Sequence, residues 1–270
     1  MSLAEFVCDL NLDRLRRFLP AEYTTLAARE LHVIADAGKD AEAMFEVGHR
    51  CENGLDTPKN PALAATWYER AANRGQACAA FNLGLILSEG TAELRDDVQA
   101  AKWIHYAAER GFPEAAFALG TFFHTGRGVT RNHHEAIHWY RVATKQGYRP
   151  AKLNLGALLV AGDNVKPNYL DAVQLFRELA KSDHPGGMAN FGWMHERGWG
   201  VPENPGLAAK WYLRAAEEGV PRAMFHLGQL HLDGRGVAAD TAAAVEWLNR
   251  AADAGYEDAA RALGEMLVVE

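Results

Sequence analysis

Apolar and polar residues follow one another along the chain with the spacing of amphipathic α-helices. Apolar side chains at positions 115, 119, 122 and 123 fall on one face of a helix expected over 113–123. A glycine-containing loop follows, and a second apolar face then appears at positions 136, 139, 140 and 143. The pattern therefore predicts a hairpin of two helices joined by a short loop.

This hairpin recurs with a constant period of 36 residues, and no insertion interrupts the series. A fixed period of this length indicates a repeat architecture in which each copy packs on the next. We therefore expect an all-α fold, an α-solenoid built as a right-handed superhelix of helix-turn-helix repeats. One glycine marks each first helix and one tryptophan marks most second helices: Gly48, Gly84, Gly120, Gly156, Gly192, Gly228 and Gly264, and Trp67, Trp103, Trp139, Trp211 and Trp247.

The ends of the predicted helices carry their own signals. A glycine follows most first helices, where a left-handed backbone is readily adopted, and another closes most second helices. Asn or Asp precedes every second helix, where its side chain can accept hydrogen bonds from unpaired backbone amides. These capping residues are Asn60, Asp96, Asn132, Asn168, Asn204 and Asp240.

The unbroken period indicates that the chain forms one continuous domain. Two N-terminal capping helices are expected within 1–38, the first near 12–19 and the second over 24–37 with Leu31 and Ala35 in register. A C-terminal capping helix is expected within 255–270, with polar residues facing water. Six repeats lie between them, at 39–74, 75–110, 111–146, 147–182, 183–218 and 219–254.

The glycine inside each first helix needs a physical reason, because glycine in a helix costs about 1 kcal/mol relative to alanine. We expect the missing side chain to make room for the tryptophan or the tyrosine of a second helix. Burying a large aromatic ring offsets the cost.

A unit of the form A-x-x-x-L-G, then G-x-G-V, then A-x-x-W-Y-x-x-A-A-x-x-G resembles the Sel-like repeat, a relative of the tetratricopeptide repeat (TPR). In the third copy these positions are Ala115 to Gly120, Gly126 to Val129 and Ala136 to Gly147. Copies two and four depart from the pattern, at Gly90 to Glu93 and at Leu175 and Asp183. The resemblance implies a non-enzymatic scaffold or adaptor whose partner is a protein or peptide.

In related solenoids the first helices line a concave groove, and the helix period indicates which of their positions are left over from the core. An asparagine-rich row begins at position 46, and amide side chains suit the backbone of an extended peptide. The equal alternative is a solvated groove wall, or amides that bond to a neighbouring helix. A tryptophan beside an arginine also suits a protein-binding site, although this tryptophan packing against the next repeat is an equal alternative. The predicted groove residues are Glu46, Asn82, Asn154, Asn190, Trp193, Arg197, Arg222 and His226.

The composition of the chain limits the kinds of partner and the cellular location that we expect. The net charge of −7 argues against a nucleic-acid partner, which would require a basic surface. No apolar run is long enough to span a bilayer, so no membrane insertion is expected. Three cysteines form no disulfide framework and favour a reducing compartment, so the expected location is cytoplasmic, or periplasmic or secreted if an export signal has been removed.

Few residues suggest catalysis, and we expect no cofactor and no metal. His134 and His138 have a spacing that can hold a metal, but no acidic second motif accompanies them and they align with a surface track. His195 and His231 are interpreted as partly buried packing residues, and Cys51 and Cys78 as inert thiols. The alternatives to a scaffold are an immunity or inhibitor protein that occludes a toxin or enzyme, and, less favoured, a small-ligand or metal-binding enzyme.

Overall fold

The computed structural model describes residues 28–37, 40–162 and 165–268. These residues form fourteen α-helices joined by short loops, with no β-strand among them. The predicted all-α class is therefore confirmed. The chain separates into two compact units, Met1–Tyr148 and Arg149–Glu270, which we describe one at a time. That the repeats form one continuous domain, and a right-handed superhelix, stays a prediction.

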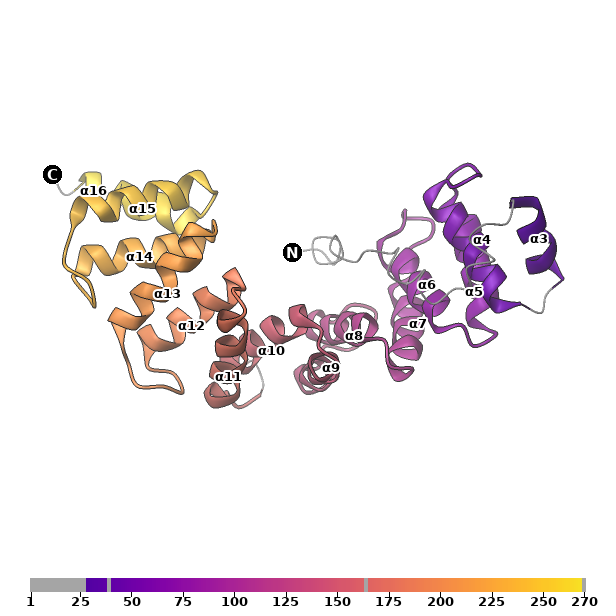
Figure 1. Cartoon of the computed structure of the whole chain (residues 1–270), viewed down its shortest axis with the longest axis horizontal. Coiled ribbons are helices and arrows are strands. Elements are labelled where there is room, and N and C mark those ends of the chain that lie inside the picture. Colours follow the sequence, from indigo (N-terminus) through magenta and orange to yellow (C-terminus); the bar gives the residue numbers. More distant parts are fainter. Residues whose placement is uncertain (1–27, 38–39, 163–164, 269–270) are drawn as a thin grey trace. The chain divides into compact units, whose positions relative to one another are not determined.

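In each unit, every helix packs against the next one along the chain (Figure 1). The helices of the first unit are α3 (Ala28–Asp36), α4 (Ala41–Asn53), α5 (Pro61–Ala72), α6 (Ala77–Glu89), α7 (Asp97–Glu109), α8 (Pro113–Thr125) and α9 (His133–Lys145). Those of the second unit are α10 (Arg149–Ala161), α11 (Tyr169–Lys181), α12 (Pro185–Arg197), α13 (Pro205–Glu217), α14 (Pro221–Asp233), α15 (Thr241–Asp253) and α16 (Glu257–Val268).

The predicted N-terminal helix over 24–37 is observed as α3, with Leu31 and Ala35 fully buried. The other predicted capping helix, near 12–19, lies outside the described residues. At the opposite end, α16 provides the predicted C-terminal helix.

The predicted helix ends are confirmed with one exception. The side chain of each of the six Asn or Asp residues accepts a hydrogen bond from a backbone amide in the first turn of its helix. Gly54, Gly126, Gly198 and Gly234 end their helices in the left-handed conformation. Gly90 is the exception, with φ of −65°, because the second repeat lacks the G-x-G-V sequence and continues into a turn at Thr91.

The glycine row allows close packing of a second helix on a first helix, as expected. The space is filled by the residue at the tyrosine position and not by the tryptophan. This residue is a tyrosine opposite Gly48, Gly120 and Gly192, and it is Ile104, Phe176 or Leu248 in the other three hairpins. A Cβ on Gly120 would lie 2.6 Å from Tyr140, and one on Gly48 would lie 2.8 Å from Tyr68. On α16, which no further hairpin follows in the described residues, the equivalent Gly264 has no such neighbour within 4 Å. The glycines therefore serve the hairpin contact and not the helix itself.

The central residue of the G-x-G loop extends back to the preceding repeat. Arg127 donates to the backbone oxygen of Ser88, 39 residues earlier. Arg235 approaches Glu196 at the same separation in sequence. The loop side chain therefore lies against the C-terminal part of the previous first helix.

Candidate functional site

The groove row that begins at position 46 was expected to lie outside the hydrophobic core. In the first unit this expectation is wrong. Glu46 and Asn82 are 0% and 1% exposed, and Ala118 in the same row is also buried. The burial of a charged residue is explained by its neighbour one turn along the helix. Arg50 Nε donates to Glu46 Oε1 at 2.9 Å, and both side chains are buried. A binding role for Glu46 and Asn82 stays a prediction.

In the second unit the same row reaches the surface, because Asn154, Asn190 and His226 are only half-buried. Asn190 Oδ1 accepts a hydrogen bond from Arg222 Nη1 at 3.3 Å. The Arg222 guanidinium lies 4.6 Å from the centre of the Trp193 ring. We call Asn190, Trp193 and Arg222 the Trp193–Arg222 cluster.

The cluster joins two repeats, since Asn190 and Trp193 lie on α12 and Arg222 lies on α14. Trp193 also makes a T-shaped contact with Trp199 at a ring separation of 4.7 Å, and is half-buried. Asn154, on α10, makes no hydrogen bond to this cluster in the described part of the chain. The structure therefore brings together three of the predicted residues and leaves Asn154 apart.

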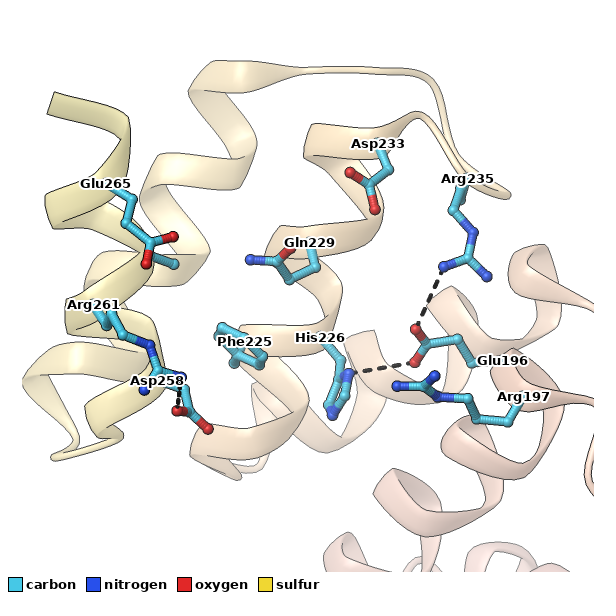
Figure 2. Close-up of a pocket in the computed structure, with 11 residues that line it drawn as sticks. Glu196, Arg197, Phe225, His226, Gln229, Asp233, Arg235, Asp258, Arg261 and Glu265 are labelled. Carbon is cyan, nitrogen blue, oxygen red and sulfur yellow. Dashed lines mark hydrogen bonds and ion pairs between the residues drawn. The ribbon is translucent and has the colours of Figure 1, made fainter. Parts of the chain in front are cut away.

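The predicted residues Arg197 and His226, each one helical turn after a cluster residue, line a pocket of about 320 Å³. Figure 2 shows this pocket. It is bounded by helices α12, α14 and α16 and by the loop after α14, so all three of its helices are first helices of their repeats. The full lining is Glu196, Arg197, Phe225, His226, Gln229, Asp233, Arg235, Asp258, Arg261, Ala262 and Glu265.

Glu196 is the buried carboxylate of this pocket, with a side chain 9% exposed. Its Oε2 accepts a hydrogen bond from the Tyr212 hydroxyl at 2.7 Å and lies 3.3 Å from His226 Nδ1. The His226 ring also stacks on the Tyr212 ring at 5.1 Å. The other oxygen, Oε1, accepts no hydrogen bond from a described residue, and its nearest cation is Arg235 at 3.8 Å.

These neighbours keep Glu196 ionised. Burial alone would raise its pKa, but the contacts with His226 and Tyr212 and the charge of Arg197 lower the pKa of Glu196 below its usual value. Burial and the adjacent carboxylate in turn raise the pKa of the Tyr212 hydroxyl, so that it remains a hydrogen-bond donor.

The rim and floor of the pocket differ in character. Asp258 pairs with Arg261 across one turn of α16. Gln229, Asp233 and Glu265 make no hydrogen bond or ion pair with any described residue, and Asp233 and Glu265 are exposed. The floor includes Phe225, whose ring packs against Tyr256 at 5.2 Å. A polar ligand with an apolar portion would fit such a lining, which contains no serine, threonine or cysteine.

Sequence reasoning missed Glu196 and Arg235. A signal was present, because Glu196 precedes Tyr212 by 16 residues and Glu52 precedes Tyr68 by the same interval, with the same hydrogen bond in both places. The polar residues of the C-terminal helix were expected only to face water. Arg261 and Glu265 are exposed as expected, and together with Asp258 they also line the pocket.

The other candidate residues remain apart from this site. His134 and His138 are exposed on α9, and the described residues contain no group of three His, Cys, Asp or Glu side chains placed to hold a metal. His195 is buried against Phe191, which confirms its packing role, and burial lowers its pKa. Cys51 and Cys78 are buried thiols, and burial raises the pKa of Cys78 to about 12. Within the described ranges, no helix has the length and apolar character needed to cross a membrane.

Comparison with known proteins supports the repeat assignment. The Sel1 repeat family matches residues 41–76, 79–112, 113–148, 149–184, 185–220 and 221–256, two residues later than most of the predicted boundaries. No curated protein matches the chain.

Among solved structures, the protective antigen c5321 of uropathogenic Escherichia coli strains, which displays an SLR fold, is 30% identical with a TM-score of 0.77 over 90% of this chain and 52% of its own. A Sel1 repeat protein from Oxalobacter formigenes is 30% identical with a TM-score of 0.65, over 84% of this chain and 66% of its own. The chain thus spans about half of the first relative and just under two thirds of the second. The immunity protein Pa5087 from Pseudomonas aeruginosa, at 20% identity and a TM-score of 0.45, is too distant to bear on function.

Proposed function

We propose that this chain, which belongs to the Sel1 repeat family, is a non-enzymatic scaffold. It binds a peptide segment or a protein surface on the first-helix face of the second unit. Proteins of this family are generally protein-interaction scaffolds. The proposed binding face comprises the Trp193–Arg222 cluster and the adjoining pocket.

One observation carries the proposal: the cluster places a half-buried tryptophan under an arginine from the next repeat, directly beside a charged pocket. Arg197 extends this surface, since it follows Trp193 by one helical turn and lines the pocket. Tryptophan and arginine are enriched among the residues that contribute most to protein–protein binding. A scaffold that uses this face needs no catalytic group.

The experiment compares capture of partners from the cells of origin by the unaltered protein and by the double variant Trp193→Ala/Arg222→Ala, followed by an affinity measurement with the purified partner. We expect the variant to bind its partner at least about tenfold more weakly, since two central contacts are removed. A thermal melt verifies that the variant remains folded.

The matched control is Trp247→Ala/Arg250→Ala on α15. It removes the same residue types and the same ring–guanidinium contact, here 4.2 Å, from a second helix outside the proposed face. Equal loss of binding in both double variants would reject the proposed face. Capture of a single enzyme that loses its activity on binding would favour the inhibitor alternative over a scaffold. The proposal also includes a cytoplasmic location.

A further inference from the structure

We infer that the pocket bounded by α12, α14 and α16 receives the cationic side chain of an arginine or lysine from the bound peptide segment. The inference rests on the proposed function and specifies the chemistry of its ligand. It follows from the pocket's floor, from the charges that remain unpaired around it, and from a buried carboxylate with one open oxygen.

The floor of the pocket can accommodate a long peptide side chain whose methylene groups are apolar. Phe225 and Ala262 contribute apolar surface from α14 and α16. Arginine and lysine bury their methylene groups along such surface while the charged end contacts polar groups. An aromatic ring in the floor adds attraction for a cation placed over it.

The unpaired charges on the rim are mainly negative. Arg261 is already paired with Asp258, and Arg235 is shared between Glu196 and Glu203. Asp233 and Glu265 make no ion pair with a described residue, whereas the charge of Arg197 acts on Glu196.

The positions of the carboxylates also favour the binding of a cation. Asp233 is the last residue of α14, where the partial negative charge of a helix C-terminus further favours a cation. The acceptor at the base is Glu196 Oε1, which lies 3.8 Å from Arg235 Nη1, beyond hydrogen-bonding distance. A guanidinium or ammonium group would supply the missing donor. An anion could approach Arg197 but would meet the rim carboxylates.

The acidic rim is particular to this place in the repeat array. One repeat earlier, the positions equivalent to Asp233 and Glu265 are Arg197 and Gln229. The repeat packing therefore does not require these carboxylates, since other copies do without them.

The test uses four short peptides as probes: acetyl-Gly-X-Gly-amide with arginine, lysine, glutamine or glutamate as X. Each is titrated into the isotope-labelled full chain, and binding is followed by NMR through the side-chain and backbone signals of His226 and Gln229. We expect the arginine and lysine peptides to bind in the millimolar range and the other two about tenfold more weakly or not at all.

The double variant Asp233→Asn/Glu265→Gln should weaken binding of the arginine peptide by about tenfold, because two charge contacts are lost. Glu217→Gln/Glu218→Gln is the matched control, since it makes the same change in net charge at exposed residues outside the pocket. The control should bind the arginine peptide as the unaltered protein does.

Three outcomes would overturn the inference: tighter binding of the glutamate peptide, no binding of either basic peptide, or equal weakening by both double variants. These results are separable from a failure of the proposed function. If the peptides fail while the Trp193→Ala/Arg222→Ala variant still loses its protein partner, only the ligand chemistry is wrong. If the Trp193→Ala/Arg222→Ala variant binds its protein partner as tightly as the unaltered protein does, the proposed face itself is wrong.

Discussion

Each unit contains one buried tyrosine that donates to a glutamate 16 residues earlier, and the two pairs differ in what surrounds them. Tyr68 and Tyr212 both form this hydrogen bond at 2.7 Å. In the first unit burial dominates and raises the pKa of Glu52, although Tyr68 and Lys59 oppose it. In the second unit His226, Tyr212 and Arg197 outweigh burial and lower the pKa of Glu196.

The comparison separates what the repeat determines from what its neighbours determine. The 36-residue period sets the helix register, and with it the position of the tyrosine hydroxyl relative to the glutamate. The charge state then depends on side chains at non-repeated positions. Glu196 of the second pair lines the pocket between α12, α14 and α16.

The largest effect should follow from breaking the packing that both pairs share. An added Cβ would lie 3.1 Å from the ring at Gly192 and 2.8 Å from the ring at Gly48. We expect Gly192→Leu and Gly48→Leu each to lower the free energy of unfolding by about 3 kcal/mol, because the buried rings cannot move aside.

Chemical denaturation measures this effect, with Gly264→Ala as the control. No side chain or remote backbone atom lies within 4 Å of a Cβ at Gly264, so this change should stabilise the protein by up to about 1 kcal/mol through helix propensity. Similar losses at Gly192 and Gly264 would mean that the glycines do not act through the hairpin contact.

Removing the hydroxyl groups tests the difference between the pairs directly. Tyr212→Phe should cost about 2 kcal/mol of unfolding free energy, because a buried, ionised carboxylate loses a donor. Tyr68→Phe should cost about 1 kcal/mol, since Glu52 is less buried and less firmly ionised. Urea denaturation at neutral pH gives both values, and the opposite ranking would contradict the electrostatic account.

The pH dependence of stability should have opposite signs for the two glutamates. The lowered pKa of Glu196 contributes stability above its unfolded-state pKa, and this is lost as the pH falls through the folded pKa. The raised pKa of Glu52 makes ionisation unfavourable to the fold, so stability falls as the pH rises from the unfolded to the folded pKa.

Glu196→Gln should therefore destabilise the protein at pH 7, with the effect fading in acid, whereas Glu52→Gln should stabilise it at pH 7. Denaturation curves of both variants between about pH 3 and pH 7 measure this, a range that includes the ordinary glutamate pKa. Parallel pH profiles for the two variants would remove the proposed contrast.

The smallest effect concerns Lys59, whose charge lowers the pKa of Glu52. Lys59→Gln should produce a small upward shift of the Glu52 pKa, measured by NMR titration of the carboxyl carbon. The Glu196 pKa serves as an internal reference and should not move. A shift at both residues would indicate a change in overall charge and not a local contact.

The sequence predicted the helices and their ends well, because these depend on local spacing and on capping residues such as Asn204. Even the departure at Asp183 is accommodated, since it adopts φ of 55° where other repeats have glycine. The choice between Trp211 and Tyr212 as the ring facing the glycine could not be made from periodicity, because both residues repeat with the same period.

The pocket could not be predicted in the same way. It requires Glu196, Asp233 and Asp258 from three helices to face one space, and this depends on how successive hairpins pack. The burial of Glu46 had a visible cause in Arg50, one turn later, but an ion pair within one helix does not by itself distinguish an exposed face from a buried one. The Trp193–Arg222 contact likewise joins residues of different repeats.

The backward extension of the loop residue offers a way to alter one position of the proposed binding face while sparing the hydrophobic interior. Arg235 belongs to a solvent-facing turn, yet its guanidinium approaches a carboxylate in the adjacent hairpin. Exchanging Arg235 would therefore change the charge beside Glu196 while the helices that maintain stability keep their composition.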